Sequence, residues 1–163
     1  RSAIRQDYPR AADVPSAGFA AGPCLFKDTM QLAAFSDNNF HLGHSAMLVN
    51  EGMPSFIVSQ LESKHDLSNM TVGILGMAFK AGSDDIRSSL SYKLKRVLKF
   101  RAKKVLTTDP MVPTSVDKEL VPLDQVLLEA DILILATPHR EYKDLVTDKP
   151  LVDMWGITPR NLA

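Results

Sequence analysis

The residues best suited to covalent chemistry in this 163-residue chain lie at positions 22–35, in the segment GPCLFKDTMQLAAF. Cys24 is the only cysteine, and Lys27 and Asp28 follow it at the start of a helix-like run. A helix N-terminus and a nearby cation both favour the thiolate, which is the nucleophilic form of cysteine. The alternative is a small buried hydrophobic side chain, the usual role of a single cysteine.

A second group of polar residues follows the apolar run MTVGILGMAF, in the segment GMAFKAGSDDIR. Gly73 and Gly76 form a Gly-x-x-Gly pattern, which is a weak phosphate-binding signal because it lacks the full glycine spacing of the dinucleotide fingerprint. Lys80 and Arg87 supply cations beside it, and an arginine can bind a phosphate bidentately. The alternative is a polar loop whose charges are solvated.

Two further polar segments follow apolar runs. Asp109 lies in TDP and His139 in ATPHREY. His139 could line a cleft at the end of a strand, but we expect it to cap a helix or to face solvent. Trp155 is expected in the core rather than as a stacking platform for a base. No cluster of residues has the spacing of zinc ligands, so no metal site is expected.

The first part of the chain must position Cys24. Residues 1–23 are mostly irregular, and their start, which lacks Met, is typical of a connecting arm cut from a longer protein. The spacing of apolar residues predicts helices over 27–36 and 41–63. The longer helix carries an apolar stripe that needs a partner, either its own domain or another subunit. The stripe consists of Leu42, Ala46, Val49, Met53, Ile57 and Leu61.

The pattern changes near residue 66, where short apolar runs begin to alternate with helical ones. Strands are expected in MTVGILGMAF, KKVLTTDP, DILILAT and PLVDMWG, and helices in SSLSYKLKRVLKF, LDQVLLEA and REYKDLV. This alternation predicts parallel strands joined by right-handed crossovers. The fold class is therefore α/β, with a helical segment over 1–66 and a Rossmann-like, doubly wound, mostly parallel sheet over 67–163. Ligands of such sheets bind beyond the carboxyl ends of the strands.

Composition excludes several classes of partner. The 19 Lys and Arg residues balance the 19 Asp and Glu residues, so no basic excess attracts nucleic acid or an anionic membrane. No apolar run approaches the roughly 20 residues that span a bilayer. A single cysteine excludes an internal disulfide framework. Cytoplasm is the expected location.

Two segments carry a resemblance to a known family. GFAAGPCLFKDTMQL resembles the active-site segment of the UDP-glucose/GDP-mannose dehydrogenase family, whose usual form is Gly-Phe-Gly-Gly-x-Cys-Leu-Pro-Lys-Asp. VGILGMAFKAGSDDIRSS is similar to that family's Gly-x-Ala-Phe-Lys-x-x-x-x-Asp-x-Arg-x-Ser segment, and ADILILATPHREYKDL and LVDMWG resemble its later strands. Ala20 and Ala21 replace glycines, and Phe26 replaces the common proline. These departures bear on loop shape and sugar preference and remove no reactive group.

The resemblance implies the carboxyl-terminal portion of an enzyme. Residues 1–66 would end its central, dimer-forming helical region, and residues 67–163 would form its nucleotide-sugar-binding domain. The family's N-terminal NAD-binding domain is expected to be absent from this chain, so the chain by itself is expected to be inactive. The apolar stripe is then expected to form a homodimer.

The family oxidises a sugar primary alcohol to a carboxylate with two NAD turnovers. A cysteine thiolate captures the intermediate aldehyde as a thiohemiacetal, which becomes a thioester and is hydrolysed. The resemblance implies that Cys24 is this nucleophile and that Lys27 and Asp28 act beside it. It also implies a cofactor contact from Arg87, and substrate contacts from Arg10, Phe79, Lys80 and Arg160.

Two classes of function remain at this point. The favoured one is part of an NAD-dependent nucleotide-sugar 6-dehydrogenase. Its substrate could be UDP-glucose, an N-acetylated UDP-hexosamine or GDP-mannose, and the family favours a UDP-linked sugar. The alternative is a non-catalytic nucleotide-binding or dimerisation module of the same fold. Such a module would have no need of Cys24, Lys27 and Asp28 together.

Overall fold

The structure is a computed structural model that describes residues 2–12, 14 and 17–158. Short helical turns, four longer helices and four strands follow one another along the chain. In order they are α1 (Ser2–Arg5), η1 (Pro9–Ala11), α2 (Leu25–Phe35), α3 (His41–Glu62), η2 (Leu67–Asn69), β1 (Thr71–Leu75), α4 (Leu90–Lys99), β2 (Lys104–Thr108), α5 (Leu123–Glu129), β3 (Ile132–Leu135), η3 (Arg140–Tyr142) and β4 (Leu151–Asp153).

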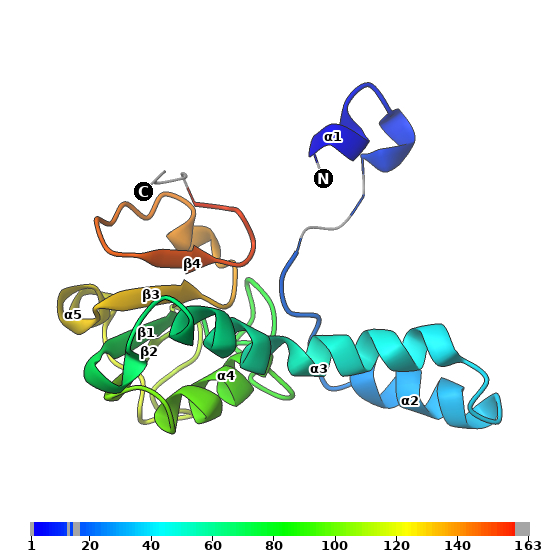
Figure 1. The fold of residues 1–163 in the computed structure, drawn as a ribbon, viewed down its shortest axis with the longest axis horizontal. Coiled ribbons are helices and arrows are strands. Elements are labelled where there is room, and N and C mark those ends of the chain that lie inside the picture. The colour runs from blue at the N-terminus through cyan, green and yellow to red at the C-terminus, as the bar shows by residue number, and fades with distance from the viewer. Residues whose placement is uncertain (1, 13, 15–16, 159–163) are drawn as a thin grey trace.

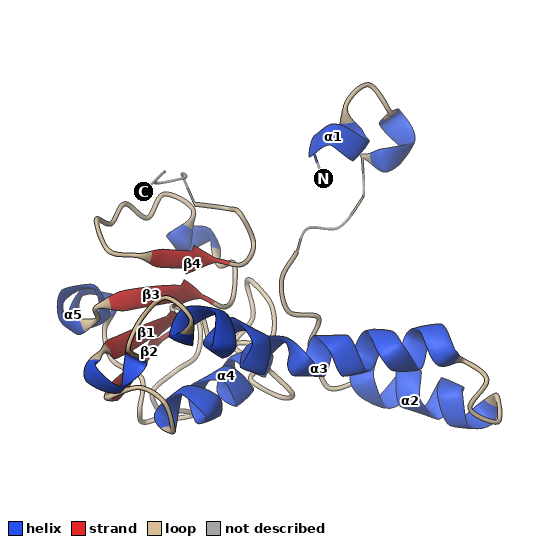
Figure 2. Ribbon diagram, viewed as in Figure 1, coloured by secondary structure: helices blue, strands red, loops and turns tan. Residues whose placement is uncertain are grey.

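The four strands form one sheet in the order β2-β1-β3-β4, and every neighbouring pair is parallel. Gly73 in the central strand β1 lies opposite Leu106 of β2 on one side and Leu133 of β3 on the other. Helix α4 connects β1 to β2, and α5 connects β2 to β3 (Figure 2). The predicted α/β fold with a parallel sheet is confirmed.

Two apolar layers cover the two faces of the sheet. Alternate residues of β1 and β3, such as Ile74 and Ile134, pack with α3 and α4. Their neighbours Leu75 and Leu135 point the other way and pack with α5. All four side chains are fully buried, so these strands read as continuous apolar runs rather than as alternating ones. The carboxyl ends of the strands therefore meet at one well-supported edge.

The stretch REYKDLV, predicted as a helix, contains only the turn η3. The prediction was wrong because a helix of seven residues is marginal unless tertiary packing supports a whole face. Tyr142 is fully buried in this stretch, whereas most of its neighbours are exposed. One anchored side chain stabilises a turn and leaves the following residues to reach β4.

The apolar stripe of α3 divides into two parts. Ile57 and Leu61 are buried against the sheet domain. Leu42 and Val49, nearer the start of the helix, are 82% and 68% exposed. Figure 1 shows why: α3 ends beside α4, but its first half extends away from the sheet with α2 alongside. Packing within the chain thus accounts for the second half of the stripe only.

Both glycines of the Gly-x-x-Gly pattern are explained by close packing. A Cβ at Gly73 would lie 2.6 Å from a methyl carbon of Val126, on α5. Gly76 has a φ of +93°, and a Cβ there would lie 2.7 Å from the backbone nitrogen of Thr137. Any larger residue would separate the strand from α5 or from the loop after β3. The pattern therefore serves the packing of the sheet and does not form a phosphate cradle.

Trp155 joins the two apolar layers, as the sequence predicted for a core residue. Its half-buried ring packs against both clusters, and its Nε1 donates to the carbonyl oxygen of Ala136 at 3.1 Å. Gly18 lies so close to the ring that a Cβ would collide with it. The segment leading to Cys24 is thus held against the carboxyl edge of the sheet.

Candidate functional site

Cys24 caps the N-terminus of α2 and is exposed. Its carbonyl oxygen accepts the first hydrogen bond of that helix, from the backbone N–H of Asp28, at 2.8 Å. The start of a helix carries a partial positive charge from its unpaired N–H groups. An accessible sulfur therefore lies where negative charge is stabilised, and the alternative of a buried hydrophobic cysteine is wrong.

The segment before Cys24 is held in place by three contacts. Phe19 is buried in the cluster between α3, α4 and the sheet. The side-chain amide of Asn50, on α3, donates to the carbonyl oxygen of Ala20 and accepts from its N–H at 3.0 Å. Gly22, with a φ of +123°, lies against the ring of Phe79, which a Cβ would approach to 3.0 Å. The cysteine segment therefore contacts the loop that follows β1.

The ion pairs around Cys24 come from two segments. The Lys27 ammonium lies 3.2 Å from the Asp28 carboxylate, and both side chains are well exposed. The Arg87 guanidinium lies 2.7 Å from the Asp85 carboxylate. Hydrogen bonds and charge from Asp85 raise the pKa of Arg87 and outweigh the opposing effect of desolvation. Asp85 therefore holds Arg87 in its charged form.

Lys80 lies in the loop between β1 and α4, directly after Phe79. Its Nζ is 5.3 Å from the centroid of the Phe79 ring, and the side chain is exposed. The ring of Phe79 therefore has Gly22 on the cysteine segment and the Lys80 ammonium as neighbours. A cation and an aromatic face beside an exposed thiol are groups that could bind an anionic ligand near a nucleophile.

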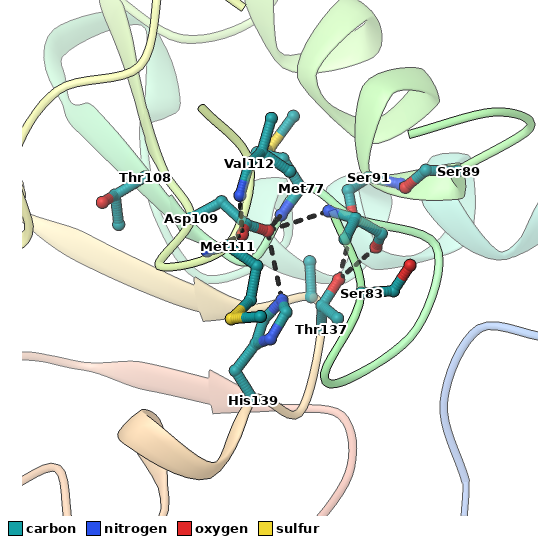
Figure 3. Close-up of polar contacts among 12 residues, drawn as sticks. Met77, Ser83, Ser89, Ser91, Thr108, Asp109, Met111, Val112, Thr137 and His139 are labelled. Atoms are coloured by element: carbon teal, nitrogen blue, oxygen red, sulfur yellow. Dashed lines mark hydrogen bonds and ion pairs between the residues drawn. The ribbon is translucent and has the colours of Figure 1, made fainter. Parts of the chain in front are cut away.

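A buried carboxylate organises the carboxyl edge of the sheet (Figure 3). Asp109, directly after β2, and His139, after β3, have no exposed side-chain surface, and the His139 Nε2 lies 3.1 Å from the Asp109 Oδ2. The carboxylate also accepts four backbone N–H groups. Their donors are Met77 at 2.6 Å, Ala78 at 2.9 Å, Met111 at 2.8 Å and Val112 at 2.9 Å.

These hydrogen bonds determine the charge of the buried group. Burial by itself raises the pKa of Asp109, but the hydrogen bonds from His139 and from the backbone N–H groups outweigh it and lower the pKa to about 2. The carboxylate is therefore ionised at neutral pH. Because its donors come from the loops after β1, β2 and β3, Asp109 ties the three loops together at the edge where ligands of such sheets bind.

A surface cavity of about 750 Å³ lies beside this edge. It is lined by Gly82, Met111, His139, Arg140, Lys143 and Ile157, among others. A second cavity, of about 650 Å³, surrounds Asp66 and Arg101 and contains none of the residues predicted to act. The first cavity is therefore the better candidate for a ligand, because it adjoins the Lys80 loop.

The structure brings most of the predicted site residues into one region and leaves two elsewhere. Gly22, two residues before Cys24, lies against Phe79, which adjoins Lys80, and Arg87 follows on the same loop. Arg10 lies exposed on η1, in an amino-terminal arm that stands apart from the sheet (Figure 1). Arg160 lies outside the described residues.

Sequence reasoning missed two residues of this region. His139 was expected to cap a helix or to face solvent. It does stand at the N-cap position of η3, where its carbonyl oxygen accepts from the N–H of Tyr142, but its side chain makes no capping bond and is fully buried, so it does not face solvent. Asn50 was not among the predicted site residues, but its side chain binds the backbone of Ala20. A signal was available for His139, which, like Asp109, directly follows a predicted strand. None was available for the pairing of Asn50 with Ala20.

None of the described helices is long and apolar enough to cross a membrane. Over the same residues, no group of three or more His, Cys, Asp or Glu side chains could hold a metal ion. The fold and the site define an α/β protein with a Rossmann-like parallel sheet, preceded by a helical segment that presents a cysteine to the sheet's carboxyl edge.

Comparisons with known proteins make this class specific. Residues 73–160 match the family model described as "UDP-glucose/GDP-mannose dehydrogenase family, UDP binding domain". A UDP-N-acetyl-D-mannosamine dehydrogenase of Pyrococcus horikoshii is 33% identical over 148 residues, which cover 87% of this chain and 34% of the relative. A UDP-glucose 6-dehydrogenase of Haloferax volcanii is 30% identical over 133 residues, 76% of this chain and 31% of the relative. The chain belongs to the UDP-glucose/GDP-mannose dehydrogenase family.

Solved structures agree with this assignment. A UDP-glucose dehydrogenase from Pyrobaculum islandicum has a TM-score of 0.80 at 28% identity, over 94% of this chain and 40% of that one. A GDP-mannose dehydrogenase from Pseudomonas aeruginosa has a TM-score of 0.77 at 26% identity, over 94% of this chain and 40% of that one. The chain spans about a third of the length of the curated relatives named above.

Proposed function

We propose that this chain is the carboxyl-terminal part of an NAD-dependent nucleotide-sugar 6-dehydrogenase that oxidises the primary alcohol of a UDP-sugar to a carboxylate. Residues 1–66 would be the end of a central helical region and residues 67–163 the nucleotide-sugar-binding domain. The observation that carries the proposal is the approach of Gly22, two residues before the exposed Cys24, to the ring of Phe79 on the loop that also carries Lys80 and Arg87. The family supports the proposal further, since its named relatives are nucleotide-sugar dehydrogenases.

Cys24 would act on the aldehyde formed by the first oxidation. Its thiolate adds to the aldehyde carbon, and the resulting oxyanion takes up a proton to give a thiohemiacetal. Removal of the second hydride and of the hydroxyl proton leaves a thioester. Water then attacks the thioester carbon, which releases the acid and returns the thiol. Asp28, one helical turn beyond Cys24, can exchange the protons of the adding and leaving groups, and Lys27 offsets the negative charge beside it.

NAD, when bound, accepts the two hydrides. Of the described residues, Arg87 fits a contact with its phosphates because the guanidinium is 72% exposed although it pairs with Asp85. Gly73 and Gly76 do not fit a phosphate cradle, since neighbouring atoms of the protein occupy the space beside both glycines. Among the residues that the structure describes, Arg87 is the cation that we assign to the cofactor, and we expect the 163-residue chain by itself to produce no NADH.

Lys80 and Phe79 would hold the nucleotide sugar. The Lys80 ammonium is exposed and makes no ion pair within the described residues, so it can neutralise a diphosphate. The Phe79 ring lies beside the Lys80 ammonium and also contacts Gly22 of the cysteine segment. Arg10 and Arg160 are proposed as further substrate contacts, Arg10 from the arm into the site of a second subunit.

We infer a homodimer from the exposed part of the helical pair. Large apolar side chains that are 40–88% exposed lie along both helices, and such patches mark association surfaces. On α2 they are Leu25, Phe26, Leu32 and Phe35, and on α3 Leu42, Leu48, Val49 and Phe56. A reduced thiol also fits a reducing compartment, so we place the reaction in the cytoplasm.

Substitution of Cys24 tests the catalytic proposal in the full-length protein. Cys24→Ser should abolish acid formation from UDP-glucose and from UDP-N-acetylmannosamine, because an alcohol is a far weaker nucleophile than a thiolate. Thr29→Ala, on the same helix, should leave the rate within about twofold of the unmodified protein, as surface changes usually do. A Cys24→Ser variant that forms acid at a near-normal rate would remove Cys24 from the mechanism.

Substitution of Lys80 tests the binding proposal and separates it from the alternative function. Lys80→Ala should weaken UDP binding by about 1–3 kcal/mol, the range for losing a hydrogen bond to a charged group. Titration calorimetry on the full-length protein, with Lys64→Ala as a remote exposed control, measures this. UDP binding without NADH formation in the unmodified protein would favour the non-catalytic nucleotide-binding module.

A further inference from the structure

His139 is a buried titratable side chain that the proposed chemistry does not use. Its Nδ1 lies 3.3 Å from the backbone nitrogen of Gly82, and its Nε2 lies 3.1 Å from the Asp109 carboxylate. A backbone N–H can only donate, so Nδ1 is the acceptor and the ring carries its proton on Nε2. The ring of Tyr142 packs edge-on against it, with the two centroids 6.0 Å apart. The ring therefore has a fixed place and two defined hydrogen bonds.

The loop between β1 and α4 is held tightly at its base. Asp109 accepts from the N–H groups of the second and third residues of the loop, Met77 and Ala78. The Ala78 carbonyl oxygen accepts from Thr137 Oγ1 at 2.7 Å. The N–H of Phe79 donates across the loop to the carbonyl oxygen of Asp85 at 2.9 Å. None of these bonds reaches residues 80–84, which form the tip of the loop.

The tip has a single tether to the rest of the described chain. Of the hydrogen bonds that the described residues make, the one from Gly82 to His139 joins residues 80–84 to another element. Gly82 has a φ of +66°, and no atom would contact a Cβ there, so local packing does not fix its conformation. Lys80 lies two residues before it. The position of the Lys80 backbone therefore depends on His139.

We propose that His139 is a positioning residue for nucleotide-sugar binding: by accepting the Gly82 N–H, it holds the tip of the loop so that Lys80 meets the diphosphate of the ligand. This inference rests on the proposed function of Lys80. Without this hydrogen bond, the tip would be held only at its base and would sample more conformations. A ligand that binds only one of these conformations would then bind more weakly than it binds the tethered loop. His139 has no direct contact with the reacting atoms in this account.

Two substitutions separate the two hydrogen bonds of His139. The Asn side chain can place its amide oxygen near the position of Nδ1, and it retains the acceptor for Gly82. The longer Gln side chain can place its amide nitrogen near the position of Nε2, and it retains the donor to Asp109. Each variant keeps one bond and loses the other. A purely structural role predicts that both behave alike, whereas the proposal predicts that they differ.

The experiment measures UDP affinity by calorimetry and the exchange rate of the Gly82 amide hydrogen by NMR, both on the full-length protein. His139→Gln should speed Gly82 exchange and weaken UDP binding about three- to tenfold, as expected for one lost neutral hydrogen bond. His139→Asn should keep both near the unmodified values. Tyr142→Phe, an equally buried neighbour whose hydroxyl hydrogen bond to Thr108 is long at 3.5 Å, is the matched control and should change neither.

The outcomes distinguish this inference from the proposed function. Equal UDP affinity in the Gln and Asn variants overturns the positioning role if Lys80→Ala still weakens binding. If the unmodified protein binds no UDP, the proposed function is overturned, and faster Gly82 exchange in the Gln variant alone still supports the tether. Unprotected Gly82 exchange in the unmodified protein overturns the tether even if both variants fail to fold.

Discussion

Replacing Asp109 by asparagine should be among the most damaging changes of similar size in this chain. The substitution keeps the shape of the side chain but exchanges one oxygen for an NH₂ group, which can only donate. The Oδ2 atom of Asp109 accepts from Met77, Ala78 and His139, and the Oδ1 atom accepts from Met111 and Val112. Whichever way the amide turns, at least two of these five N–H donors meet another donor.

The magnitude follows from that count. A hydrogen bond to a charged group contributes about 1.5–3 kcal/mol, so losing two should cost about 3–6 kcal/mol. A typical domain has a free energy of unfolding of only about 5–15 kcal/mol, so the variant should be close to unfolding. Asp144→Asn, at an exposed position, should change the free energy of unfolding by less than about 0.5 kcal/mol.

The loss of unfolding free energy caused by Asp109→Asn should become smaller as pH falls. The pKa of Asp109 is about 2 in the folded chain, against an ordinary value of 3.8 for the free side chain. A lowered folded pKa adds stability that is fully present above pH 4 and is lost as pH falls through the folded value. The contribution is about 2 kcal/mol at pH 7, and roughly half of it remains at pH 3.

Guanidinium unfolding followed by the fluorescence of Trp155 measures this, because Trp155 is the only tryptophan and contacts both apolar layers. The protein concentration is held fixed, since association would shift the transition. The difference between the unmodified chain and Asp109→Asn should narrow by about 1 kcal/mol between pH 7 and pH 3. A difference below about 1 kcal/mol at pH 7, or one that does not change with pH, would refute the reasoning.

The remaining predictions concern assembly and packing. Val49→Asp should turn a self-associating chain into a monomer in sedimentation at micromolar concentration, since it places two charges in the proposed interface. Ser55→Asp, about 120° around the same helix, should not, and a monomeric unmodified chain would contradict the dimer. Gly73→Ala should lower the free energy of unfolding by about 1–3 kcal/mol, because its methyl group would meet Val126 and Leu133. Gly52→Ala, in open space on α3, should raise it by about 0.5–1 kcal/mol, and equal effects at both glycines would contradict the packing account.

Local patterns predicted the elements of this fold because each pattern lies within a few consecutive residues. The apolar runs of β1 and β3 are continuous since both faces of these strands are covered. The helices α2, α3, α4 and α5 begin and end within two residues of the predicted ranges. The motif spacing around Cys24 and Lys80 indicated the family, which the comparisons confirm.

The division of the α3 stripe was not contained in its own spacing. Leu42 and Leu61 satisfy the same helical period, but Leu61 is buried and Leu42 is exposed. Burial depends on which other segments lie beside each turn, and α4 and the sheet reach only the second half of the helix. A helical period identifies an apolar face and does not identify what covers it.

The site itself shows the same limit. The sequence by itself determined that Asp109 and His139 follow two successive strands of the chain in a parallel sheet, and that Cys24 begins a helix. Only the tertiary structure decided that the two side chains meet, and that Asn50 and Phe79 hold the cysteine segment against the loop that carries Lys80. Spacing along the chain reports local backbone geometry, whereas these contacts join residues about 30 or more positions apart, and they form only when the packed sheet and helices fix the loops between them.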